Sequence, residues 1–265
     1  MKNSLLWRIG KNNIKESYLF GTIHIYDSSI FQIPDIIYRL IDSVDTYSPE
    51  SDNRHISYSD MISNMTVSDS GYSLKNYLNE ECYNNILEIS DIDSEIFDTY
   101  KPFFLSTFVL SDDDMPSSSI DAELLAYAQI TDKTIIEMES FAEQIQAVDL
   151  IPYNEQAAII EKSIATLGKK SDFTQLMLDY KMQDIQALKR SLEEMAPAQI
   201  FIDSIQKNRN VVMADKIDSI INNGFSSFTA VGALHIPDTP DVKGIVTLLQ
   251  EKGYDMQPVE FTFNI

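Results

Sequence analysis

Short apolar runs separated by polar turns occupy both ends of the chain. Runs of four to eight residues that are rich in β-branched and aromatic side chains are typical of strands. The first two runs, at 4–9 and 17–20, are joined by a polar stretch and predict a β-hairpin. Further strands are predicted at 46–48, 134–138, 228–231 and 257–263.

Helical spacing of apolar residues dominates the rest of the chain. Pro34 opens a helix in which apolar side chains recur three and four residues apart. The polar stretch 51–120 carries shorter helical patterns, of which 103–110 is the most apolar. Further helices are predicted at 121–129, at 141–189 with breaks near Pro152 and Gly168, at 199–224 and at 242–252.

The strands therefore cluster at the two ends of the chain and the helices fill the middle. This order predicts an α/β protein with a central mixed β-sheet that is built from N- and C-terminal strands and flanked by helices. We expect a single domain over residues 1–265, in which 51–200 form a mostly helical insertion.

The chain is strongly acidic, with 41 Asp and Glu against 20 Lys and Arg and a net charge of -21. Such a surface repels phosphate backbones, so we expect no nucleic acid partner. No apolar run approaches the roughly 18 residues of a membrane span. The one cysteine, Cys82, permits no intramolecular disulfide. We expect a cytoplasmic protein as the sequence stands, or an extracytoplasmic or membrane-anchored one if a leader was trimmed.

Two of the three histidines end the same short motif. His24 and His235 each follow a glycine by three residues, directly after an apolar strand, whereas His55 lies in a polar loop and is interpreted as structural. With eight glycines in 265 residues, this spacing arises by chance for about 3% of positions. The doubled Gly-x-x-His pattern therefore indicates one shared site, although a lone histidine of this kind is more often structural.

The position of these motifs has a chemical meaning. Residues just past a strand reach the rim of the sheet, where open α/β folds bind ligands. Glycine lets the backbone turn and lets a ligand approach closely. A histidine there can bind a metal or transfer a proton.

Carboxylates and a basic pair are placed where they could join the histidines. Glu50 follows the third strand and Glu139 the fourth, so both are predicted at the rim. Glu50 could be a metal ligand or the base that activates a metal-bound water, or a plain surface residue. Arg209 could hold a substrate carboxylate or orient Glu50, with Asn210 beside it, or form a solvated turn. Tyr18, Tyr26 and Tyr47 could donate to an oxyanion but are more often core residues.

Blocks of sequence along almost the whole chain resemble the TraB/GumN family. The most specific are Ser-Tyr-Leu-Phe-Gly-Thr-Ile-His at 17–24 and Val-Gly-Ala-Leu-His at 231–235. Other matching blocks lie at 6–9, 34–35, 45–50, 121–128, 136–144, 208–217 and 244–259, in the order of the family.

The resemblance implies a fold shared with ChaN-like and erythromycin-esterase-like proteins, in which helices flank a central sheet. It also implies a site of five residues: His24, His235, Glu50, Arg209 and Asn210. In the TIKI branch of the family the activity is that of a peptidase that needs a divalent metal such as manganese or cobalt.

The chain departs from the family pattern near two of the carboxylates. Glu137 and Met138 replace a small residue and a leucine before Glu139, and Pro49 replaces an aliphatic residue before Glu50. Because proline lacks the N–H of a strand residue, it could displace Glu50 or mark an edge strand.

Two functions of different classes follow. The first is a metal-dependent hydrolase, most simply a peptidase, that acts on a peptide or small-molecule substrate. In it His24, His235 and Glu50 would bind a divalent metal (Mn, Co or Zn), and Glu50, Arg209 and Asn210 would serve catalysis. The second is a non-catalytic protein that sequesters a peptide or haem in the same cleft.

Overall fold

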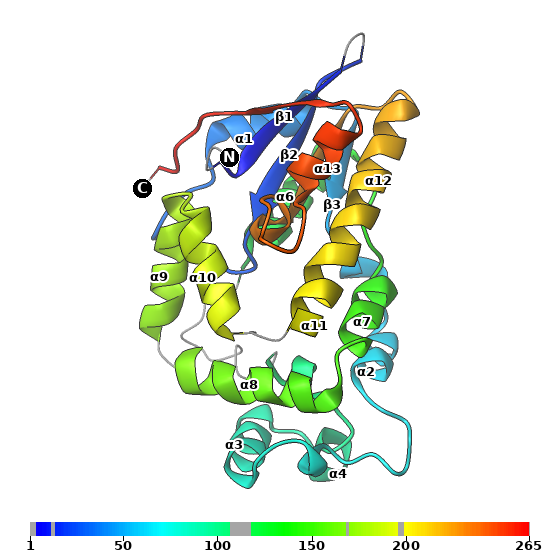
Figure 1. Ribbon diagram of the computed structural model, residues 1–265, viewed down its shortest axis with the longest axis vertical. Helices are drawn as coiled ribbons and strands as arrows, with labels where there is room; N and C mark the ends of the chain where they lie inside the picture. Colours follow the sequence, from blue (N-terminus) through cyan, green and yellow to red (C-terminus); the bar gives the residue numbers. More distant parts are fainter. Residues whose placement is uncertain (1–3, 12–13, 107–117, 168–169, 196–198, 265) are drawn as a thin grey trace.

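The computed structural model describes residues 4–11, 14–106, 118–167, 170–195 and 199–264 (Figure 1). The strands are β1 (Leu6–Gly10), β2 (Ser17–Thr22), β3 (Thr46–Pro49), β4 (Thr134–Ile135), β5 (Ser227–Gly232) and β6 (Asp255–Pro258). The α-helices are α1 (Asp35–Asp42), α2 (Tyr58–Met65), α3 (Glu80–Ser90), α4 (Ser94–Phe97), α6 (Ile120–Ile130), α7 (Phe141–Asp149), α8 (Tyr153–Leu167), α9 (Lys170–Lys181), α10 (Ile185–Met195), α11 (Gln199–Ile202), α12 (Asn208–Asn222) and α13 (Ile245–Glu251). Short 3-10 helices η1 (Asn53–His55), η2 (Leu74–Asn76), η3 (Pro102–Leu105) and η5 (Ala233–His235) and the π-helix η4 (Asp203–Lys207) complete this part of the chain.

One mixed sheet joins the two ends of the chain in the order β4-β3-β5-β2-β1-β6. The strands β4, β3, β5 and β2 are mutually parallel, whereas β1 runs antiparallel to both β2 and β6. The predicted hairpin is confirmed, with Leu6 opposite Phe20 and Ile9 opposite Ser17. The predicted α/β class with a mixed sheet and flanking helices is likewise confirmed.

Successive side chains along each strand point to opposite faces of the sheet, and an apolar layer covers each face. On β2, Phe20 faces a cluster that also contains Tyr47 of β3 and Phe228 of β5, whereas Leu19 faces the opposite cluster. Helices α1, α6, α9 and α10 cover the first face, and α12 and α13 cover the second. Each fully buried aromatic side chain of this kind contributes about 2–3 kcal/mol of transfer free energy.

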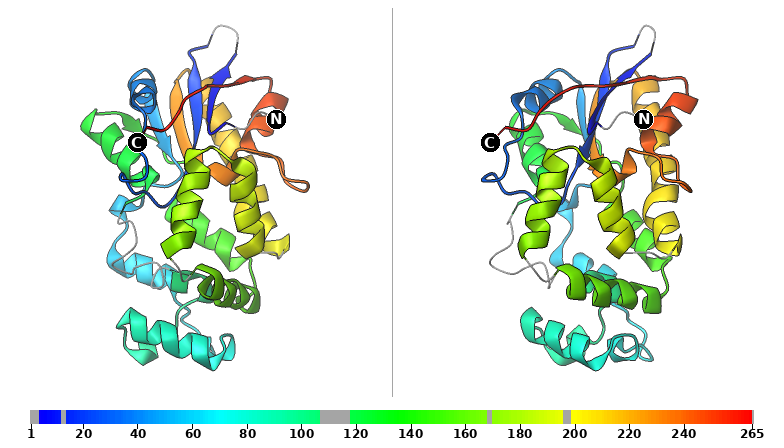
Figure 2. Two further views of the ribbon diagram at one scale, coloured as in Figure 1. Left: turned by 90° about the vertical axis from the view of Figure 1, so that its left-hand side faces the viewer. Right: turned by 60° about the vertical axis from the view of Figure 1, so that its left-hand side comes forward.

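The middle of the chain builds a third apolar cluster away from the sheet. Residues of α3, α4, α7 and α8 pack together there, around buried Phe97 and Ile160. Figure 1 shows the sheet in the upper half of the molecule, α8 crossing beneath it, and α3 and α4 lowest; both views of Figure 2 agree. The stretch 51–200 does not lie wholly apart from the sheet. It supplies the edge strand β4, and its helix α6 packs on one face of the sheet.

The sheet differs from the sequence predictions at its two edges. The strand predicted at 134–138 ends at Ile135, although the Met138 N–H still donates to the Pro49 carbonyl at 2.8 Å. The closing strand lies at 255–258 instead of 257–263. Beyond it the chain leaves the sheet, because Phe261 and Phe263 pack into the first apolar cluster instead of continuing the strand.

Helix boundaries were predicted better than helix continuity. The break near Pro152 is confirmed, since α7 ends at Asp149 and α8 begins at Tyr153. Gly168 lies outside the described residues, and the helices on either side of it, α8 and α9, run in different directions (Figure 1). The helix predicted at 199–224 is interrupted by the π-helix η4. The helix predicted at 103–110 is only the 3-10 turn η3 as far as Leu105, and 107–110 lie outside the described residues. Within the described ranges we find no helix with the length and apolar character to cross a bilayer.

Candidate functional site

The carboxyl ends of neighbouring parallel strands bring the predicted site residues to one edge of the sheet. Both β2 and β3 pair with β5, and Thr22 at the end of β2 lies opposite Gly232 at the end of β5. His24, Glu50 and His235 follow these three strands by one to three residues. The edge is therefore assembled from segments far apart in sequence, with His235 lying 211 positions after His24, as the doubled motif predicted.

The glycine of the first motif allows the turn of the second motif to pack against it. A Cβ atom added to Gly21 would lie 2.9 Å from the Cα of Ala233 and 2.8 Å from the Cδ1 of Ile236. Real side chains do not approach so closely, so residue 21 must lack one. Its carbonyl also accepts a hydrogen bond of 2.5 Å from the buried Tyr180 hydroxyl.

Arg209 lies between the two predicted carboxylates. Its Nη2 donates to Glu50 Oε1 at 2.5 Å and to Glu139 Oε2 at 2.7 Å. Its Nε donates to both oxygens of Glu139, at 3.1 and 2.9 Å. All three side chains are largely buried, with exposed fractions of 11%, 9% and 4% for Arg209, Glu50 and Glu139. The predicted contact between Arg209 and Glu50 is therefore present, and Glu139 completes it.

The π-helix before α12 contributes to the placement of Arg209. In η4 the hydrogen bonds of the backbone reach one residue further than in an α-helix. The Ile205 carbonyl, which lies in this segment, accepts a hydrogen bond of 3.1 Å from Arg209 Nη1. The guanidinium has five N–H groups, and these contacts occupy all but one of them, on Nη1.

Glu50 is held on both carboxylate oxygens. Oε1 accepts from Arg209 and, at 3.3 Å, from the Gln144 side chain, whereas Oε2 accepts from the Gly232 N–H at 2.7 Å. Burial by itself would raise the pKa of this carboxyl group. The charge of His235, which is protonated at the low pH where Glu50 titrates, and the charge of Arg209 outweigh burial and lower the pKa to about 2. Glu50 is therefore ionised at neutral pH.

His235 is buried and held by one polar contact. Its Nδ1 lies 2.6 Å from Oδ1 of Asn210, and the Asn210 amide nitrogen donates to the Lys243 carbonyl at 2.9 Å. Because the amide NH2 is used for Lys243, its oxygen faces the imidazole, and this network assigns the proton of the ring to Nδ1. Burial lowers the pKa of His235 to about 4, so the ring is neutral at neutral pH and Nε2 carries a lone pair.

His24 has the opposite environment. Its side chain is 73% exposed, and its Nδ1 lies 3.0 Å from Oδ2 of Asp121. The other oxygen of Asp121 accepts a hydrogen bond of 2.5 Å from the Thr22 hydroxyl. The negative charge of Asp121 and its hydrogen bond raise the pKa of His24 to about 9, so this ring is protonated at neutral pH.

The two histidine environments form one electrostatic unit. The charges of Glu50 and Arg209 act on the pKa of both imidazoles, and the charge of His24 lowers the pKa of His235. A Cβ atom added to Gly232 would lie 3.4 Å from Glu50 Oε2 and 3.5 Å from His235 Cδ2, so these two side chains border the same backbone position.

Other candidates lie elsewhere, and two contacts were not predicted. Tyr18 donates to Glu16 near the start of β2, and Tyr47 is fully buried in the core. Asp121 and Gln144 contact His24 and Glu50 but were not singled out by the sequence. The one available signal for both was their place inside the sequence blocks shared with the family.

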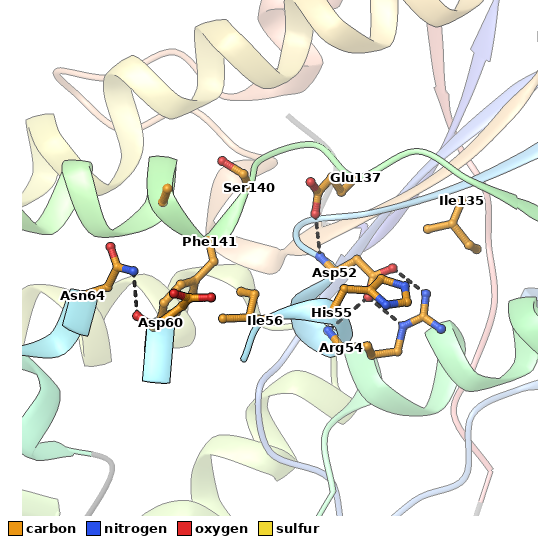
Figure 3. A pocket seen from close by; sticks show the side chains of 11 residues that line it. Asp52, Arg54, His55, Ile56, Asp60, Asn64, Ile135, Glu137, Ser140 and Phe141 are labelled. Atoms are coloured by element: carbon orange, nitrogen blue, oxygen red, sulfur yellow. Dashed lines mark hydrogen bonds and ion pairs between the residues drawn. The ribbon is translucent and has the colours of Figure 1, made fainter. Parts of the chain in front are cut away.

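His55 lies in a different depression of the surface. Figure 3 shows it in a cavity of about 680 Å³ between the β3–α2 connection and the start of α7. There Asp52 pairs with Arg54, and its backbone N–H donates to Glu137 at 3.0 Å. None of the five predicted site residues lines this cavity.

The predicted metal ligands are not arranged as a metal site here. In the described part of the chain, no group of three or more His, Cys, Asp or Glu side chains is placed to hold a metal ion. Glu50 uses both oxygens for Arg209, Gln144 and a backbone N–H, and His24 is paired with a carboxylate. Of the predicted ligands, His235 alone combines a neutral ring with an Nε2 lone pair.

Comparison with known proteins agrees with the blocks that the sequence shares with one family. The family model described as the TraB/PrgY/gumN family matches residues 5–258, which is nearly the whole chain. A search of the curated proteins found no match. The match spans every strand of the sheet and both Gly-x-x-His motifs, and the chain belongs to the TraB/PrgY/gumN family.

Proposed function

We propose that this edge of the sheet is the active site of a hydrolase. The observation that carries the proposal is the buried His235, whose Nδ1 is bound to Asn210 and whose Nε2 retains a lone pair beside the ionised Glu50. A neutral imidazole held in one tautomer can act as a general base, and a neighbouring carboxylate can stabilise its protonated form.

In the proposed reaction, Nε2 of His235 takes a proton from water while the water oxygen attacks a carbonyl carbon. The imidazolium that forms is stabilised by the adjacent Glu50 carboxylate, and the proton then passes to the leaving group as the bond to the carbonyl carbon breaks. Asn210 keeps the ring in the required tautomer. Comparable proton transfers contribute about 10²–10⁴-fold to rate.

The arrangement favours a positioning role for Arg209. Four of its five N–H groups are used within the protein, so a substrate clamp would rely on the remaining Nη1 hydrogen or on displacement of a carboxylate. Arg209 instead helps to keep Glu50 ionised, fixes it beside His235 and forms the hydrogen bonds to Glu139. Glu139 offsets the positive charge of Arg209 and lets it remain buried.

A divalent metal stays a prediction that this arrangement fits poorly. For His24, His235 and Glu50 to bind Mn, Co or Zn together, His24 would have to release its proton and Glu50 would have to leave Arg209. A metal bound there would supply Lewis acidity and an activated water. The roles given above to His235, Asn210 and Arg209 involve only residues of this chain.

The substrate proposed is a peptide or a small molecule with a hydrolysable carbonyl group, and the preference for peptides rests on the family. The alternative, a protein that sequesters a peptide or haem without cleaving it, uses the same residues. The two differ in whether any bond of a bound ligand is broken.

The test is a cleavage assay with a random peptide library read by mass spectrometry, with chelator and then with Mn, Co or Zn added. We expect cleavage by the wild type, loss of cleavage in His235→Gln, and full cleavage in the matched control His55→Gln, whose histidine lies in the other cavity. Cleavage that persists in His235→Gln would exclude the proposed base. A haem absorption band without cleavage would favour the sequestering protein, and dependence on an added ion would confirm the predicted metal.

A further inference from the structure

The loop that follows β2 is attached to the start of α6 by backbone hydrogen bonds. The Tyr26 N–H donates to the Ser118 carbonyl at 2.8 Å, and the Ile120 N–H donates to the Ile23 carbonyl at 3.3 Å. These two bonds lie on either side of the motif histidine in sequence. They bring Asp121, in the first turn of α6, against the loop.

Asp121 uses a different oxygen for each of two neighbours in this region. Oδ1 accepts from the hydroxyl of Thr22, which is 1% exposed and ends β2, and Oδ2 lies 3.0 Å from Nδ1 of His24. With both oxygens engaged, the carboxylate has one preferred rotation.

The same contact occurs at the second motif with a different side chain. His235 is held at Nδ1 by an oxygen of Asn210 from α12, and His24 is held at Nδ1 by an oxygen of Asp121 from α6. In both cases a residue of a flanking helix directs the other ring nitrogen, Nε2, away from the contact. A side-chain oxygen at one nitrogen is how proteins set the tautomer and rotation of a functional histidine.

We propose that Asp121 is a positioning residue that fixes the ring of His24 through Nδ1 and leaves Nε2 for the reaction, with Thr22 holding the carboxylate in place. This proposal rests on the proposed hydrolase site and extends it, because it assigns a role to a residue outside the five predicted ones. Loss of an outer contact of this kind typically lowers activity by about 10–100-fold.

Nuclear magnetic resonance of the three imidazole rings tests the contact independently of any activity. The His24 signals are assigned by their loss in His24→Gln, and the ring is read at a pH where it is neutral. We expect the proton on Nδ1 in the wild type and a shift toward Nε2 in Asp121→Ala, while the His235 signals stay unchanged. Asp121→Leu, which keeps the approximate size of the side chain but has no oxygen to contact Nδ1, gives the same result if the alanine variant does not fold. Unchanged His24 signals in both variants would overturn the proposal.

The peptide cleavage assay then tests the role. We expect Asp121→Ala to lower kcat by about 10–100-fold with little change in KM. The matched control is Glu123→Ala, which removes a carboxylate from the same helical turn at an exposed position. A kcat in Asp121→Ala equal to that of the control would overturn the role. If the wild type cleaves nothing, the hydrolase proposal fails, and the ring signals still decide whether Asp121 positions His24.

Discussion

His24 and His235 end identical motifs at neighbouring strand ends, yet the protein gives them opposite properties. His235 is 6% exposed and is bound by the neutral amide of Asn210, whereas the His24 side chain is 73% exposed and is bound by the carboxylate of Asp121. Burial lowers the pKa of the first ring to about 4, and the adjacent charge raises that of the second to about 9. A shared motif therefore does not imply a shared chemical role.

Two titratable groups whose pKa values are pushed apart often divide acid and base roles between them. Here the two histidine environments differ in their contacts as well as in their charge. His235 adjoins Glu50, which Arg209 and the Gly232 N–H hold in place, while His24 lies at the rim with Asp121. The following predictions test how far the two environments differ.

The largest expected difference is in activity. His235→Gln should lower kcat by about 10²–10⁴-fold, because the base would be lost. His24→Gln should lower it less, by roughly 10–100-fold, because an exposed ring can be replaced in part by water. Initial rates of peptide cleavage measure both. Equal losses would show that the two rings act as one unit, as two ligands of a single metal would.

The next effect concerns the buried ion pairs. Arg209→Met should lower the free energy of unfolding by about 3–5 kcal/mol, because two buried carboxylates lose their common partner. Urea unfolding measures this change. The matched control Arg8→Met removes an arginine whose pairs with Glu16 and Asp255 are exposed, and should cost no more than about 1 kcal/mol. Similar losses in the two variants would contradict the prediction.

The two motif glycines should differ as well. Gly21→Ala places a Cβ 2.9 Å from the backbone of Ala233 and should cost about 1–3 kcal/mol. In Gly232→Ala the nearest atoms lie at 3.4 and 3.5 Å and belong to side chains, so the cost should be smaller. Thermal unfolding of both variants makes the comparison. A Gly232→Ala variant less stable than Gly21→Ala would contradict it.

The smallest effects are on the pH dependence of stability. Below about pH 6.5 the unfolded chain protonates residue 235 while the folded protein does not, so His235 lowers stability as pH falls toward 4. His24 acts in the opposite direction: it adds stability below pH 6.5, and this is lost as pH rises through about 9.

Urea unfolding across this pH range gives the free energy of unfolding as a function of pH. On the acid side, this free energy should change less steeply with pH in His235→Gln than in the wild type. On the alkaline side, it should change less steeply in His24→Gln. Unfolding of His55→Gln, whose histidine lies outside the site, provides the reference slope. Identical slopes in all three variants would show that neither ring has the environment described here.

Much of the site could be predicted from local sequence. His24, His235 and Glu50 each follow an apolar strand, and strand ends reach the rim of a sheet whatever the strand order. Arg209 and Asn210 were candidates on residue type, and the resemblance to the family assigned them to the site. Asp121 and Gln144 could not be singled out, because each stands in an ordinary helical pattern and contacts its partner more than 90 residues away.

For Tyr47, the interpretation as a core residue is confirmed, because all four residues of β3 are buried and Tyr47 lies in the first apolar cluster. One strand boundary was wrong for a reason that only packing supplies. The strand predicted at 257–263 moved to 255–258, because apolar residues such as Phe261 also suit packing beneath the sheet.

By itself the sequence determined the mixed α/β class, the strand ends and the residues that follow them, since these depend on hydrophobic patterns over a few neighbouring positions. Tertiary structure alone decided that β5 lies between β2 and β3, and so which residues meet. It also decided that one motif histidine is buried and neutral and the other exposed and charged. The charge of an imidazole depends on solvent exposure and on partners distant in sequence, and a motif of four residues specifies neither.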